Sequence, residues 1–173
     1  MDYIVQGFGE AIRLLAGFDS EVYRIIALSL LVSTSATVVA SLIFVPLGVY
    51  LGIKTFRGKR IFSRTVYTFM SIPSVIVGLV VALLLARRGP FGYLRLLYTP
   101  AAMIIAQTIL VIPLILGLTY NLSKNRGTPL EKVSRTLGGN RLDSVILIIR
   151  ELKIDILVNV ATAFSRAISE VGA

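Results

Sequence analysis

The sequence contains no cysteine and no histidine. Without cysteine, the chain has no disulfide framework and no thiolate chemistry. Without histidine, it lacks the commonest metal ligand, the usual catalytic base and the usual side chain for switching near neutral pH. It also has no glycine-rich phosphate loop ending in Lys-Ser or Lys-Thr. We therefore expect no catalytic residue, no bound metal and no cofactor in this chain.

Charged residues are scarce, at 16% of the chain, whereas hydrophobic residues make up 55% and the mean hydropathy is +0.84. A typical soluble domain is about 25% charged and about 45–50% apolar. The chain thus has too few polar side chains to cover a water-soluble surface, and a disordered chain would be poor in apolar residues. Its 173 residues suit a single domain. This composition indicates an integral membrane protein.

Three long runs contain no charged residue: 25–53, 65–86 and 96–123, of 29, 22 and 28 residues. A helix rises about 1.5 Å per residue, so about 20 apolar residues cross the hydrocarbon core of a bilayer. We therefore predict an all-α, polytopic transmembrane protein. The predicted spans are 25–53, 65–86, 98–120 and, in a fourth apolar stretch, 154–173.

The basic residues are unevenly divided between the segments outside these runs. Residues 1–24 contain two, 54–64 contain five, 87–95 contain three and 124–153 contain seven. Cytoplasmic loops carry the excess of lysine and arginine. We therefore expect the N-terminus outside, the second and fourth of these segments in the cytoplasm, and a location in the plasma or inner membrane. Most of the net charge of +9 then reflects topology, without a nucleic-acid partner.

The first 22 residues have an amphipathic pattern. Apolar side chains recur at three- and four-residue spacing, at Ile4, Phe8, Ala11, Ile12, Leu15 and Phe18. This pattern is typical of a helix that lies in the membrane interface, in contact with lipid. We expect such a helix over residues 1–22 on the extracytoplasmic side, and the alternative is a frayed terminus.

Small residues form a stripe in the first span, with Ser29, Ser33, Thr37 and Ser41 at every fourth position. Small side chains allow helices to approach closely in lipid. The stripe is therefore either a packing face or the lining of a polar path.

Polar residues and prolines inside the second and third spans are candidates for a substrate path. Proline in a spanning helix frees a backbone carbonyl that a hydroxyl or water must satisfy, and an amide at membrane depth needs a partner. These residues either hold helices together or line the path. The candidates are Ser71, Pro73, Ser74, Gln107 and Thr108, with Pro113 as a second site of kinking.

Two charged residues, Arg166 and Glu170, lie inside the fourth apolar stretch. They are four residues apart, so they share one helix face and can pair. Charges inside a membrane face the protein interior and often mark function. Two interpretations stay open: a structural ion pair, or a gate or substrate contact.

The segment 124–153 is too long for a simple turn. Thr128-Pro129-Leu130-Glu131 predicts a helix start, with threonine as the cap and proline at the first helical position. Gly138-Gly139-Asn140 predicts a helix end and turn before a second amphipathic helix. Such a hairpin either docks a soluble partner or lies on the membrane surface without one.

The sequence of this segment resembles the "EAA" loop of binding-protein-dependent ABC importer permeases. Arg135-Thr136-Leu137-Gly138 matches a common wording of that loop, and Ile148 follows Gly138 after the nine residues that the family has. Lys132-Val133-Ser134 stands where the family has Glu-Ala-Ala, and Arg150-Glu151 where it has Leu-Pro. The chain is identified as a member of the type-1 (MetI-like) importer transmembrane domains.

Other segments resemble the tungstate-type branch of these permeases. They are Gly9–Leu15, Ile72–Gly78, Ile148–Glu151 and Phe164–Ala173, so the likeness covers nearly the whole chain. The family continues past this point with further spanning sequence, and we therefore expect the 173 residues to be truncated at the C-terminus.

The resemblance implies a homodimer in which each copy docks one cytoplasmic ATPase subunit and receives its substrate from an extracytoplasmic binding protein. The substrate would be an oxyanion, most closely tungstate. The alternatives are a permease for molybdate, sulfate or an amino acid, and a membrane scaffold that transports nothing. The expected ATPase-coupling residues are Glu131, Arg135, Thr136, Leu137 and Gly138.

Overall fold

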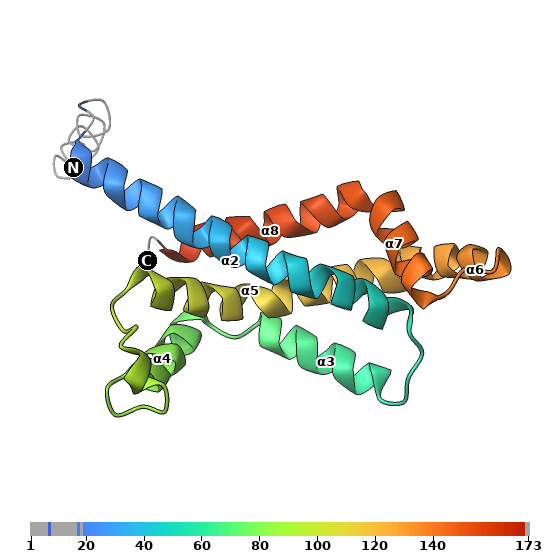
Figure 1. The fold of residues 1–173 in the computed structure, drawn as a ribbon, viewed down its shortest axis with the longest axis horizontal. Helices are drawn as coiled ribbons and strands as arrows, with labels where there is room; N and C mark the ends of the chain where they lie inside the picture. Colours follow the sequence, from blue (N-terminus) through green and yellow to red (C-terminus); the bar gives the residue numbers. More distant parts are fainter. Residues whose placement is uncertain (1–6, 8–16, 18, 172–173) are drawn as a thin grey trace.

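A computed structural model describes residues 7, 17 and 19–171. The six apolar residues on which the predicted interfacial helix rests lie outside the described residues. In the described part of the chain, every regular element is helical (Figure 1). The elements are α2 (Ser20–Ile53), α3 (Lys59–Met70), α4 (Ser74–Leu85), the 3-10 turn η1 (Gly92–Leu94), α5 (Pro100–Leu122), the π-helical turn η2 (Ser123–Gly127), α6 (Thr128–Thr136), α7 (Arg141–Glu151) and α8 (Lys153–Val171).

Within the described residues, two helical stretches are long and apolar enough to cross a membrane: α2 over its 34 residues, and the 37-residue stretch Pro100–Thr136 that joins α5, η2 and α6. A third candidate is the pair of α3 and α4, taken as one broken span. The predicted fourth span corresponds to α8, whose 19 residues include four charged ones. An all-α fold with apolar helices is therefore confirmed.

The core forms where α2 packs along α5 and α8 (Figure 1). Its fully buried residues include the small Ala40 of α2 and Ala163 and Ala167 of α8, together with the larger Ile115 of α5 and Ile148 of α7. In the stripe of small hydroxyl residues, Ser33 and Thr37 are buried. The two cavities described below are lined by α3, α4, α5 and α8, and no residue of α2 lines them. The structure therefore favours the interpretation of the stripe as a packing face.

The C-terminal half of α2 approaches α5 and η2 closely because of Gly52. A β-carbon at this position would lie 2.6 Å from Cβ of Ser123 and 2.8 Å from the carbonyl oxygen of Tyr120. The Ser123 hydroxyl uses the close approach to donate a hydrogen bond to the carbonyl of Val49 at 2.9 Å. Small residues at a helix crossing and an interhelical hydrogen bond are the usual means of association in lipid.

The predicted span 65–86 is divided in the structure. α3 ends at Met70 and α4 begins at Ser74, and the two helices meet at 90°. Proline has no backbone N–H and restricts the residue before it to extended backbone, so a helix cannot continue through Ile72 and Pro73 without loss. In the structure Pro73 has extended backbone and α4 begins directly after it. Pro113, in contrast, lies inside the single helix α5.

Candidate functional site

The first candidate site is the hairpin formed by α6, the turn 137–140 and α7, which we call the α6–α7 hairpin. It lies at the end of the molecule opposite the start of α2 (Figure 1). The predicted helix, turn and helix are present, but the predicted threonine cap is wrong. Thr128 lies inside a helical path that continues from α5 through η2, and its hydroxyl donates to the carbonyl of Lys124 at 2.9 Å. α6 thus continues α5 through η2 without a break in the helix.

The turn of the hairpin is fixed by backbone geometry. Gly138 has a φ of +84°, in the left-handed region that glycine adopts at little cost. The N–H groups of Gly138 and Gly139 donate to the carbonyls of Arg135 and Ser134 at 3.0 and 2.9 Å. These bonds satisfy carbonyls that the end of a helix leaves free.

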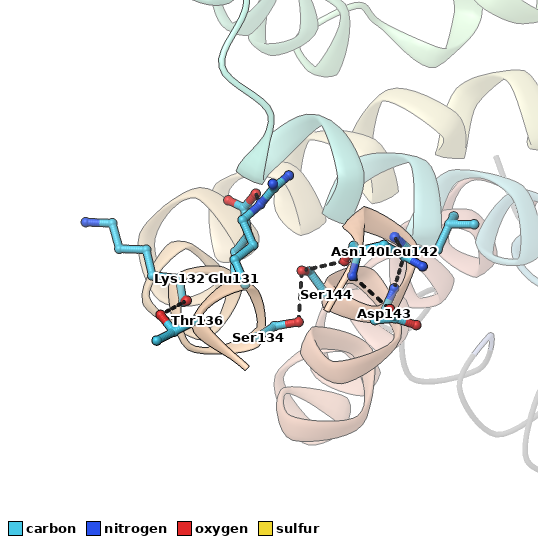
Figure 2. Close-up of polar contacts among 9 residues, drawn as sticks. Glu131, Lys132, Ser134, Thr136, Asn140, Leu142, Asp143 and Ser144 are labelled. Carbon is cyan, nitrogen blue, oxygen red and sulfur yellow. Dashed lines mark hydrogen bonds and ion pairs between the residues drawn. The ribbon is translucent and has the colours of Figure 1, made fainter. Parts of the chain in front are cut away.

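α7 starts with a reciprocal cap, which Figure 2 shows. The Asn140 side chain accepts from the N–H groups of Leu142 and Asp143 at 2.7 and 3.0 Å, and the Asp143 carboxylate accepts from the Asn140 N–H at 2.8 Å. Between the helices, the buried hydroxyls of Ser134 and Ser144 are 3.1 Å apart. The cap and this bond hold α6 and α7 in one relative orientation.

The outer face of the α6–α7 hairpin is apolar. Leu137 is 82% exposed, and Val133 and Leu142 are also exposed. Gly138 and Thr136 lie on exposed backbone beside them, and the Thr136 hydroxyl donates to the carbonyl of Lys132. Val133 was not among the predicted coupling residues, although its helical spacing from Leu137 is the signal that could have found it.

Two of the predicted coupling residues, Glu131 and Arg135, point elsewhere. The Glu131 carboxylate accepts from Nε of Arg135 at 3.0 Å. Both side chains line a pocket of about 250 Å³ against the C-terminal end of α2 and the start of α7. The sequence pattern of the loop placed all five residues together, whereas the structure separates these two from the exposed apolar face.

The second candidate site consists of two adjoining cavities. The large cavity, of about 590 Å³, lies between α3, α4 and α5, and its lining is apolar apart from Arg166 of α8. The small cavity, of about 260 Å³, is lined by α4, α5 and α8, with Ser74, Gln107 and Glu170 among its residues. Val77 and Leu110 line both cavities, so the two meet there.

An ion pair connects the two cavities. Nε of Arg166 lies 3.4 Å from Oε1 of Glu170, one helical turn away on α8. The side-chain oxygen of Gln107 is buried and has no hydrogen-bond partner among the described residues. A cation, an amide and the Ser74 hydroxyl are thus gathered from three helices around a partly open space.

The remaining predicted path residues have local roles. The Thr108 hydroxyl donates to the carbonyl of Ile104 at 2.7 Å, and the Ser71 hydroxyl to that of Tyr67 at 3.3 Å. Pro73 forms the break before α4. None of these three lines the large or the small cavity.

Residues 44–172 match the family described as "Binding-protein-dependent transport system inner membrane component". The chain belongs to this family. It is therefore a membrane protein of the ABC importer class, as its EAA-type loop predicts. The match includes the α6–α7 hairpin and both cavities, and it begins inside α2.

Curated relatives of this family member include two described as "Tungstate uptake system permease protein TupB". The one from Peptoclostridium acidaminophilum is 60% identical over 173 residues, which are 100% of this chain and 76% of the relative. The one from Campylobacter jejuni is 37% identical over 172 residues, 99% of this chain and 72% of the relative. A "Probable anion ABC transporter permease protein" from Haloferax volcanii is 38% identical over 148 residues, 86% of this chain and 64% of the relative.

Proposed function

We propose that this chain is the permease subunit of an ATP-driven importer and that its substrate is tungstate. The observation that carries the proposal is the 60% identity, over all 173 residues, to a tungstate permease. The alignment covers the whole chain, so it includes both the transmembrane helices and the hairpin. It favours tungstate over the other substrates that the superfamily resemblance leaves open.

The two adjoining cavities are the proposed path of the anion. A dianion in a membrane needs positive charge and hydrogen-bond donors, because hydrocarbon supplies neither. Arg166 supplies the charge, and Ser74 and Gln107 supply polar groups at the small cavity. In the structure Glu170 pairs with Arg166, so the passing anion would compete with an internal carboxylate for the same guanidinium.

The α6–α7 hairpin is the proposed contact for a separate cytoplasmic ATPase subunit, in which ATP is hydrolysed. Its exposed Leu137 and Val133 suit an apolar groove, and Gly138 fixes the turn that presents them. The continuous helix from Pro100 to Thr136 would transmit movement of the hairpin directly to the cavity wall. An extracytoplasmic binding protein, a second copy of the permease, and an N-terminus outside complete the proposed assembly.

Uptake in cells tests the substrate. In a bacterial strain that lacks its own tungstate permease, this chain with its ATPase and binding protein should raise cellular tungsten about tenfold or more. Elemental analysis of washed cells measures tungsten, molybdenum and sulfur side by side. Because the relative that shares 60% of this sequence is a tungstate permease, accumulation of molybdenum without tungsten would contradict the proposal.

A further inference from the structure

We propose that the pocket between α2 and the α6–α7 hairpin binds a phosphate group, as carried by an anionic phospholipid or by free phosphate. This basic pocket has a volume of about 250 Å³. Its lining includes Tyr50, Ile53, Lys54, Thr55, Glu131, Arg135 and Arg141. It lies apart from the two cavities proposed as the anion path and has no role in the function proposed above.

The charges around the basic pocket do not cancel. Three cations, from the end of α2, from α6 and from α7, face the single carboxylate of Glu131. That carboxylate is already engaged by Nε of Arg135. Among the described residues, Lys54 and Arg141 have no carboxylate within ion-pairing distance. The pocket therefore keeps about two positive charges without an internal counterion, which favours an external anion.

The chemistry of the lining suits phosphate oxygens. Arg135 uses its Nε for Glu131, which leaves the guanidinium fork for a second acceptor, and arginine forks match phosphate geometry. Nζ of Lys54 is held 5.2 Å from the centre of the Tyr50 ring, so the ring limits where the ammonium can move. The Tyr50 hydroxyl and the Thr55 side chain line the same space and can donate hydrogen bonds.

The position of the basic pocket suits a lipid headgroup. It lies where α2 ends at Ile53, directly after the apolar run of the first span, and Ile53 itself is a wall of the pocket. Basic groups at the end of a transmembrane helix lie at headgroup depth, where such pockets bind anionic lipids.

Native mass spectrometry of the full chain in a neutral detergent tests the proposal. The chain should retain dioleoylphosphatidylglycerol in preference to dioleoylphosphatidylcholine. Neutralising two of the cations in K54Q/R141Q should lower the affinity for phosphatidylglycerol about 100-fold, since each hydrogen bond from a charged group to the phosphate contributes about tenfold or more. The control K132Q/R57Q removes two exposed charges that do not line the pocket, so only screened long-range attraction is lost and the affinity should change less than about threefold.

Inorganic phosphate distinguishes the two sources of the group. Displacement of bound phosphatidylglycerol by millimolar phosphate would identify the free anion as an occupant, and persistence of the lipid would identify the headgroup. Either result, together with the loss of affinity in K54Q/R141Q, confirms a phosphate site. Equal retention of the two lipids would overturn the proposal, because the pocket would then show no preference for an anionic headgroup. Equal losses in K54Q/R141Q and in the control pair would also overturn it and would leave only diffuse charge attraction.

Discussion

Replacing Arg166 and Glu170 together by glutamine should give a permease that folds but takes up tungstate about 10- to 100-fold more slowly. Hydrogen bonds to a charged group contribute about 1.5–3 kcal/mol, and the double variant removes those that Arg166 would make to the anion. It also removes both members of the ion pair, so no charge is left unpaired in the cavity wall. Uptake in proteoliposomes and thermal unfolding in detergent measure the two effects separately.

Two single variants serve as controls for this prediction. R166Q leaves the Glu170 carboxylate without its partner, so it should lower the unfolding temperature as well as uptake. R166K keeps the positive charge but loses the planar fork, so it should retain part of the uptake. Normal uptake by the double variant would contradict a role in transport and would leave the pair with a structural role only.

Replacing Gly138 by valine should release the ATPase subunit while leaving the membrane helices intact. With a φ of +84°, a β-branched side chain at this position costs about 1–2 kcal/mol or more, so the turn between α6 and α7 changes its path. The exposed Leu137 next to it would then be presented in a different direction. Copurification of the ATPase should fall about tenfold, and transport-coupled ATP hydrolysis should fall with it.

The matched control for this variant is G138N. Asparagine adopts the left-handed region more readily than valine, and no atom lies within 4 Å of a β-carbon placed at Gly138. The asparagine variant should therefore keep most of the ATPase contact. Full coupling in G138V would remove the turn from the docking mechanism, and loss in both variants would mean that the contact depends on the absence of a side chain.

Much of the fold follows from the sequence because its signals are local. Charge-free runs predict helices that can span, and Gly138-Gly139-Asn140 predicts the hairpin turn and the α7 cap. The break between α3 and α4 was expected only as a kink at Pro73, because the angle depends on how α4 packs against α5. The helical junction through η2 was also not predictable, since Gly127-Thr128-Pro129 is equally a normal helix start.

In the candidate sites, too, the sequence predicted contacts between residues close in the chain and missed those that depend on tertiary packing. Spacing on α8 predicted that Arg166 and Glu170 can pair, and the structure contains the pair. The EAA-type pattern grouped Glu131 with Leu137, but only tertiary packing decides which side of α6 faces α2. Lys54 and Arg141 are 87 positions apart, so no local pattern could indicate that they share a pocket.

The most direct test of the proposed path uses the absence of native cysteine. Ser74→Cys places one thiol at the small cavity, and T162C places one on an exposed part of α8 as a control. In the assembled importer with ATP, a negatively charged thiosulfonate should modify Cys at position 74 and stop uptake, and excess tungstate should protect it. Modification that leaves uptake intact, or protection that is equal at both positions, would contradict a path for tungstate between α4, α5 and α8.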